Sequence, residues 1–480
     1  MARRRQKKRP LSRPRPRNGL PVGNAPVLEH LKQISLDAAG IDIGSRQHYV
    51  AVPEGRDTEV VRSFGTFTAD LHGLADWLQQ CGIKTVAMES TGVYWIPIFE
   101  ILEARGFDVK LVQPAKLKHA PGRKTDVLDC QWIQQLHTYG LLEGSFRPAE
   151  QVAVLRSYLR QRDRLVRLAS QHIQHMQKAL TEMNIQLHHV ISDITGATGM
   201  RILEAIVAGE RSPRQLAEMR DPNCKNSVET ICLALTGNWR EEHLFALQQA
   251  LEFYQFHRQK IAEVDKRIEA HLKTFEDKSA NRESIAEGEA KMPRTKKQAK
   301  KKRKKRPHDP SFDIPSELQR ITGVDLLAID GIGPYIALAL ISEIGTDMSK
   351  WPTEEQFCSW LTLCPGNYKT GGKQHKSKTH TRPSSSRAAH LLRLAANSLW
   401  DADCALGAYF RRMKSRRGAP KAIVATAHKL ARLVYRMLKY GTEYVDFGAE
   451  WYETRFKQQQ LEGLKRKAKQ LGFDLVETPT

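Results

Sequence analysis

The sequence predicts an N-terminal α/β domain with a mixed sheet, a helical coiled-coil arm and a mainly α C-terminal domain. Three observations support this fold class. From Leu36 onwards, short β-branched runs alternate with helical segments. Residues 152–190 and 241–275 repeat apolar side chains in alternating steps of three and four, which is the spacing of a coiled-coil seam. From Ile321 to about Phe447 the pattern is helical.

The strands of the first domain are short and well separated. LDAAGIDIGSRQHYVAVP predicts two strands that meet at Gly44–Ser45, and EVVRSFGTF predicts a third. KTVAMES and DVKLVQP predict two more, each preceded by a helical segment. Three strands followed by alternating helices and strands indicate a mixed sheet flanked by helices. We place this domain at residues 36–150.

The two heptad segments define the arm, which we place at residues 151–275 with an insertion at 190–240. They are predicted to pair as an antiparallel coiled coil or to pack between subunits, and two amphipathic helices of an ordinary bundle are the alternative. The apolar positions on which this rests are Val166, Ala169, Ile173, Met176, Leu180, Met183 and Leu187, then Leu244, Leu247, Leu251, Tyr254, Ile261, Val264, Ile268 and Leu272.

Positive charge is concentrated in three places. The net charge is +23, and residues 1–21 and 291–306 hold nine and eleven Lys or Arg with no acid. Residues 366–440 hold 17 Lys or Arg against Asp401 and Asp403 alone. Such an excess within a folded segment predicts a polyanionic partner, most simply a nucleic acid. For the tails alone, improved solubility or unspecific RNA binding is the alternative.

The remaining boundaries follow from composition. Residues 1–35 are predicted to be a basic flexible arm, 276–315 a basic disordered linker, 316–447 the C-terminal domain and 448–480 a charged helix and tail.

The seven cysteines are odd in number and lack zinc-ligand spacing, which fits reduced thiols. Neither a membrane span nor a secretory signal is apparent. We therefore expect a cytoplasmic protein, associated with a bacterial or archaeal nucleoid.

Four acidic residues form the candidate catalytic centre. Asp42 lies in the first strand within GIDIGS, Glu89 ends the strand VAMES, and Asp126 and Asp129 lie three apart on one helix face. Each motif alone is weak, but their order along an α/β domain is informative. Two Mg²⁺ ions about 3.5–4 Å apart can clamp a scissile phosphate between them. Carboxylates supply the hard oxygen ligands that Mg²⁺ prefers, and Mn²⁺ accepts the same donors.

These motifs resemble a known family. LDAAGIDIGSRQHYVAV, VAMESTGVYWIPIFEILEARGFDVKLVQP and PGRKTDVLDCQWIQQLHTYGLLEGSFRP are similar to the RuvC-like, RNase-H-fold domain of the DEDD insertion-sequence transposases. This is the insertion-sequence-110 family, which includes Piv-type DNA invertases. The resemblance covers roughly residues 37–180 and 320–440. It implies that Asp42, Glu89, Asp126 and Asp129 are the catalytic metal ligands.

The C-terminal domain carries candidate nucleic-acid contacts. Gly331-Ile332-Gly333-Pro334 resembles a helix-hairpin-helix turn, whose glycines let backbone N–H groups approach a phosphate. A plain tight turn between packed helices is the alternative. Basic side chains elsewhere are expected to contact nucleic acid as well. They are Arg123, Lys124, Lys373, Lys376, Lys378, Arg382, Arg387 and Arg393.

Three serines precede an apolar helix that begins near Arg387. A serine in that position is most often an N-cap, but a helix N-terminus flanked by cations also suits a nucleophile that attacks a phosphate. The resemblance assigns this role to Ser384, while the spacing leaves Ser385 and Ser386 open. It also implies a covalent phosphoserine link to DNA and guidance by a structured non-coding (bridge) RNA.

The leading hypothesis is a site-specific DNA transposase or recombinase that works as a homodimer or homotetramer. A RuvC-like junction nuclease with water as the nucleophile is an alternative. GIDIGS is also similar to the phosphate-binding turn of sugar kinases and actin-like ATPases, although no second nucleotide-binding lobe is apparent. A non-enzymatic nucleic-acid-binding protein would leave the four acids unexplained.

Overall fold

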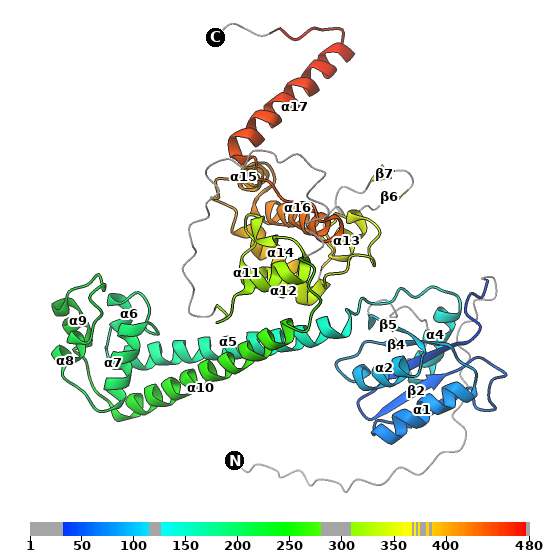
Figure 1. Ribbon diagram of the computed structural model, residues 1–480, viewed down its shortest axis with the longest axis horizontal. Helices are drawn as coiled ribbons and strands as arrows, with labels where there is room; N and C mark the ends of the chain where they lie inside the picture. Colours follow the sequence, from blue (N-terminus) through cyan, green and yellow to red (C-terminus); the bar gives the residue numbers. More distant parts are fainter. Residues whose placement is uncertain are drawn as a thin grey trace, which may run out of the picture. The chain divides into compact units, whose positions relative to one another are not determined.

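The computed structural model describes residues 32–114, 126–279, 309–366, 369–370, 373–374, 381–383 and 386–476. The chain divides into two compact units, Met1–Arg147 and Pro148–Thr480, each of which is described here by itself (Figure 1). Most of the predicted basic arm and basic linker lies outside the described residues.

The first unit is built on a mixed five-stranded sheet of order β3-β2-β1-β4-β5. The strands are β1 (Ala38–Ile43), β2 (Gln47–Ala51), β3 (Val61–Gly65), β4 (Thr85–Glu89) and β5 (Asp108–Val112). β1 pairs antiparallel with β2 and parallel with β4, while β5 extends the parallel side. This sheet, together with its helices, confirms the predicted α/β, RNase-H-like fold.

The two faces of the sheet are covered by different helices. Helices α1 (Thr68–Gln80) and α2 (Trp95–Ala104) supply the main core, into which Ala39, Ile41 and Ile43 of β1 point. Because successive side chains of a strand alternate between faces, Gly40 and Asp42 lie on the opposite face. Helix α4 (Asp126–Thr138) packs there, and its Ile133 contacts Ala87 and Val112.

Gly40 allows α4 to approach β1 very closely. A Cβ atom at this position would lie 2.3 Å from the backbone nitrogen of Gln134 and 2.4 Å from the carbonyl oxygen of Cys130. Hydrogen bonds hold the same contact along its length. Gln134 Nε2 donates to the Ala38 carbonyl at 3.3 Å, and His137 Nε2 lies 2.8 Å from Thr85 Oγ1. The absence of a side chain on one strand residue therefore fixes the position of α4.

The same contact buries a histidine. Burial, with a smaller contribution from the charge of Lys110, lowers the pKa of His137 to about 4. The imidazole is thus neutral near pH 7. It can form a hydrogen bond with Thr85 without placing a positive charge in the buried contact between the sheet and α4.

The second unit begins with two long helices that pack side by side. α5 (Glu150–Glu182) and α10 (Glu241–Leu272) share an apolar core that contains most of the predicted heptad positions (Figure 1). Arg162 and Asp265 form a buried ion pair of 2.6 Å between the two helices. Between them in the sequence, four short helices form the tip: α6 (Leu187–Val190), α7 (Ala197–Val207), α8 (Pro213–Glu218) and α9 (Val228–Leu235).

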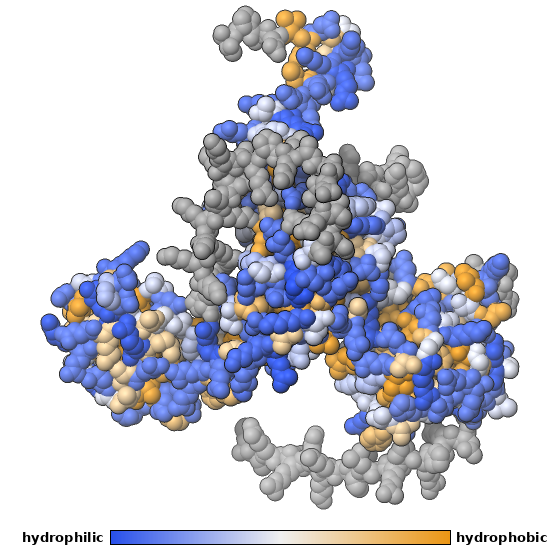
Figure 2. Space-filling view, viewed as in Figure 1, coloured by the Kyte–Doolittle hydropathy of each residue, from blue (hydrophilic) through white to orange (hydrophobic). Residues whose placement is uncertain are grey.

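The rest of the second unit is mainly helical, as predicted. Its longer elements are α11 (Ile314–Thr322), α12 (Pro334–Ile344), α13 (Glu354–Trp360), α14 (Arg387–Asn397), α15 (Ala405–Arg417), α16 (Ala419–Tyr440) and α17 (Gly448–Gln470). Short elements are η2 (Leu326–Ala328) and the pair β6 (Lys369–Thr370) and β7 (Lys373–Gln374). Figure 2 shows mostly hydrophilic side chains over α17, a helix in which no residue is buried. Over the described residues, no helix combines the length and apolar character required to cross a lipid bilayer.

The Gly40 contact gives a direct stability prediction. We expect Gly40→Ala to destabilise the protein by about 2 kcal/mol or more, because backbone atoms of α4 cannot yield as a flexible side chain would. The matched control is Gly73→Ala within α1, where a Cβ would meet no atom within 4 Å. That change should stabilise the helix by about 0.5–1 kcal/mol. Thermal melting of both variants tests the contrast, and equal melting temperatures would contradict the role of Gly40.

Candidate metal centre and serine segment

Three of the four predicted acids come together on the α4 side of the sheet. Asp42 of β1 and both Asp126 and Asp129 of α4 each offer a carboxylate oxygen, and these oxygens lie within 4.8 Å of one another. Asp126 is exposed, while Asp42 and Asp129 are half-buried. The group is therefore open to solvent on one side and built into the fold on the other.

Glu89 lies beside this group without belonging to it. Ala87 of β4 faces α4, so Glu89, two residues further on, points to the same face of the sheet. Ile41 is paired in parallel with Met88, and Asp42 and Glu89 are the next residues of the two strands. The Glu89 carboxylate accepts a hydrogen bond from Thr91 Oγ1 at 2.7 Å.

The local charge distribution fits a cation. Asp126 and Asp129 lie in the first turn of α4, where the helix dipole favours negative charge. Burial, and then the charge of Asp42, raise the pKa of the neighbouring Cys130 thiol, whose Sγ donates to the Val127 carbonyl at 3.1 Å. What remains is a set of hard carboxylate oxygens, and these fit Mg²⁺ or Mn²⁺.

The serine segment is described only at its C-terminal end. Ser384 and Ser385 lie outside the described residues, whereas Ser386 is the N-cap of α14 and its Oγ accepts a hydrogen bond from Ala389 N at 3.3 Å. Ser386 thus has the helix-capping role that the sequence analysis gave as the alternative to a nucleophile.

The predicted nucleic-acid contacts have different surroundings. Arg382 is exposed and Arg393 is half-buried, while Arg387 is held in ion pairs with Asp163 and Glu343. Lys373 belongs to the short strand β7. Arg123, Lys124, Lys376 and Lys378 lie outside the described residues.

The glycine turn before α12 packs against another helix. Gly331 has a φ of 87°, and a Cβ atom there would lie 2.7 Å from the carbonyl oxygen of Ala395 in α14. Gly333 is the N-cap of α12. The tight packing at Gly331 explains why a glycine occupies this position. It agrees with the alternative left open by the sequence, a plain tight turn between packed helices. Contact of this turn with a phosphate stays a prediction.

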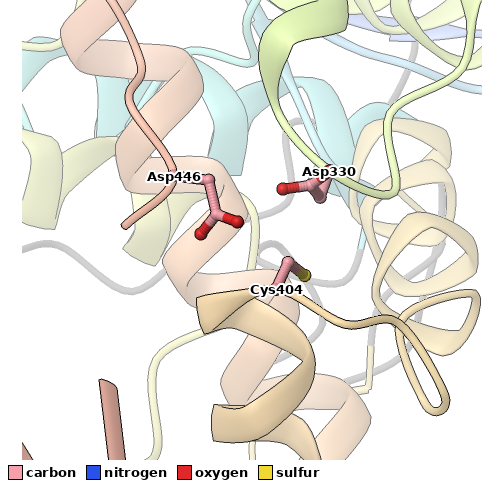
Figure 3. A group of neighbouring side chains, drawn as sticks. All are labelled: Asp330, Cys404 and Asp446. Carbon is pink, nitrogen blue, oxygen red and sulfur yellow. The ribbon is translucent and has the colours of Figure 1, made fainter. Parts of the chain in front are cut away.

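A second group of ligand-type side chains lies in segments between the C-terminal helices. Asp330, Cys404 and Asp446 point toward one another from separate segments (Figure 3). Cys404 Sγ accepts a hydrogen bond from Gly407 N, and Asp446 accepts one from Ala405 N, so both cap the N-terminus of α15. Burial raises the pKa of Cys404 to about 11, which keeps the thiol neutral. Helix capping accounts for Cys404 and Asp446, and no sequence spacing indicated the group.

Comparison with protein families agrees with this geometry. A model described as a transposase, that of the IS110-type DEDD transposases, matches residues 39–185. A second model, the transposase IS116/IS110/IS902 family, matches residues 325–411. The chain belongs to the IS110 family of DEDD transposases. It is therefore an enzyme that acts on DNA, and the family indicates use of a divalent metal. No curated protein matches the chain.

The grouping of Asp42, Asp126 and Asp129 predicts that this transposase binds a divalent cation through their carboxylates. Asp129→Asn should weaken Mn²⁺ binding by about 100-fold or more, because changes outside the ligand sphere already cost about 10–100-fold in metal affinity. Titration of the full chain with Mn²⁺, followed by electron paramagnetic resonance, measures this. Glu54→Gln, an exposed acid of the same unit, is the control and should bind as the parent does. Without metal, Asp129→Asn should melt no earlier than the parent, because it removes repulsion between like charges.

Proposed function

We propose that this transposase cuts and rejoins DNA by means of divalent cations held by Asp42, Glu89, Asp126 and Asp129, with Ser384 as the nucleophile. The observation that carries the proposal is the convergence of three of these carboxylates at the junction of β1 and α4. We expect two Mg²⁺ ions. When bound, they would supply positive charge to the oxygens of the scissile phosphate.

The serine step can be written with its atoms balanced. Ser384 Oγ forms a bond to phosphorus, the bond from phosphorus to one DNA oxygen breaks, and the serine proton passes through solvent to that departing oxygen. A hydroxyl of the second DNA strand then forms a bond to phosphorus, the bond from phosphorus to Ser384 Oγ breaks, and the proton of that hydroxyl passes through solvent to the serine oxygen. The ester conserves the energy of the phosphodiester bond until the strands are exchanged.

A structural reason disfavours Ser386 as the nucleophile. Ser386 Oγ already accepts the Ala389 N–H, and a nucleophile at this position would have to leave its capping interaction. The family resemblance also aligns the nucleophile with Ser384. Ser385 is distinguished from it by experiment only.

We further propose a homodimer or homotetramer and a structured guide RNA as partners. The acids and the serine segment belong to different compact units of the chain, so separate copies can supply them to one reaction. The basic runs at residues 1–21 and 291–306 supply charge for RNA or DNA backbones. A monomer with full activity would contradict the shared site.

Ser384→Ala tests the nucleophile. With duplex DNA that spans one end of the insertion sequence, and RNA transcribed from that same element, the parent should form a protein–DNA adduct that survives denaturation, and Ser384→Ala should form none. Peptide mass spectrometry of the adduct should locate the modification on Ser384.

Two control variants accompany this experiment. Ser386→Ala should still form the adduct while losing about 1 kcal/mol of stability with its helix cap. Asp42→Asn should bind DNA but not cut it. Cleavage that persists in Ser384→Ala would favour the RuvC-like nuclease, with water as the attacking group.

A further inference from the structure

A cluster of charged side chains forms where α5, α12 and α14 meet. Arg387, the first residue of α14, donates from Nη2 to the Asp163 carboxylate of α5. Its Nε lies 3.4 Å from Oε1 of Glu343, which belongs to α12. A single guanidinium therefore joins the start of α14 to two other helices.

Glu343 is the buried centre of this cluster. Only 8% of its surface is exposed, and it accepts from Arg160 at 3.0 Å as well as pairing with Arg156 at 3.2 Å. Arg156 also donates to the backbone carbonyls of Ser342 and Glu343, at 3.1 and 2.8 Å, which end α12. A buried carboxylate needs such partners, because an uncompensated charge in the interior is strongly unfavourable. The C-terminal end of α12 is thereby fixed to α5.

Asp163 is held from a second side. The hydroxyl of Tyr335, at the start of α12, donates to it, and the guanidinium of Arg162 lies 5.4 Å from the centre of the Tyr335 ring. Arg162 itself is paired with Asp265 of α10. The Asp163 carboxylate thus has a defined position, set by both long helices of the arm.

We propose that Arg387 is a positioning residue for the covalent step: it fixes the N-terminal turn of α14, which follows the proposed nucleophile Ser384 in the sequence. The inference rests on the proposed serine chemistry. Ser386 caps the same turn, so the described end of the serine segment is held by its cap and by the Arg387 anchor together. Asp163 and Glu343 act through Arg387 and do not touch DNA.

This role differs from the sequence prediction for Arg387. A guanidinium that contacts a DNA phosphate should contribute mainly to DNA affinity and to its salt dependence. A guanidinium held between two carboxylates should instead affect the rate of adduct formation once DNA is bound. The two roles are separated by measuring the rate at saturating DNA and the half-saturating DNA concentration independently.

The test compares Asp163→Asn, Arg387→Gln and Arg387→Lys in the full chain, with duplex DNA that spans one end of the insertion sequence and RNA transcribed from that same element. Asp163→Asn and Arg387→Gln should slow adduct formation at saturating DNA by about 10- to 100-fold, the cost of a small misplacement of a reacting group. Their half-saturating DNA concentration should equal that of the parent. Arg387→Lys keeps the charge and should restore part of the rate.

A double variant tests whether Asp163 and Arg387 act through their shared contact. Asp163→Asn combined with Arg387→Gln should be no slower than the slower single variant, because both remove the same contact. The control is Glu263→Gln, which breaks an exposed ion pair with Lys260 on α10 and should leave the rate unchanged. Melting curves show which variants are folded at the assay temperature.

Several results would overturn the inference. These are weaker DNA binding with an unchanged rate at saturation, multiplicative losses in the double variant, or single variants as fast as the parent. If the parent itself forms no Ser384 adduct, the proposed serine chemistry fails, and the positioning role fails with it.

Discussion

The approach of α4 to β1 at Gly40 determines where the acidic side chains of the first unit lie. Strand alternation sends Asp42 to the α4 side of the sheet, and the missing Cβ of Gly40 lets the helix backbone rest directly on the strand. The first turn of α4 then brings Asp126 and Asp129 to Asp42. Backbone atoms form this contact on both sides. The packing of α4 on β1 therefore sets the backbone positions from which the carboxylate side chains extend.

Much of this arrangement is predictable from local sequence patterns. Each β-branched run became a strand, and the three-residue spacing of Asp126 and Asp129 placed both on one side of a helix, because these are properties of neighbouring residues. The heptad positions were equally readable, and the structure shows that α5 and α10 pair within one chain. Glu89 was assigned to the correct strand end, but its hydrogen bond with Thr91 was not foreseeable from the sequence.

Contacts between segments that are far apart in the chain could not be predicted from the sequence. Asp163 and Glu343 lie 180 residues apart, each on a helix with other charged side chains, and no spacing relates them to Arg387. Arg387 was accordingly assigned to nucleic acid on charge alone. Gly331 illustrates the same limit. The turn was evident from its glycines, but the helix that packs against it was not.

The length of α5 has a mechanical consequence. Its 33 residues span about 50 Å, and Asp163 lies on the same continuous helix as Met176 and Leu180, which belong to the core shared with the tip. A continuous helix paired with a second one resists bending, so a torque applied at the tip is carried along the axis to Asp163.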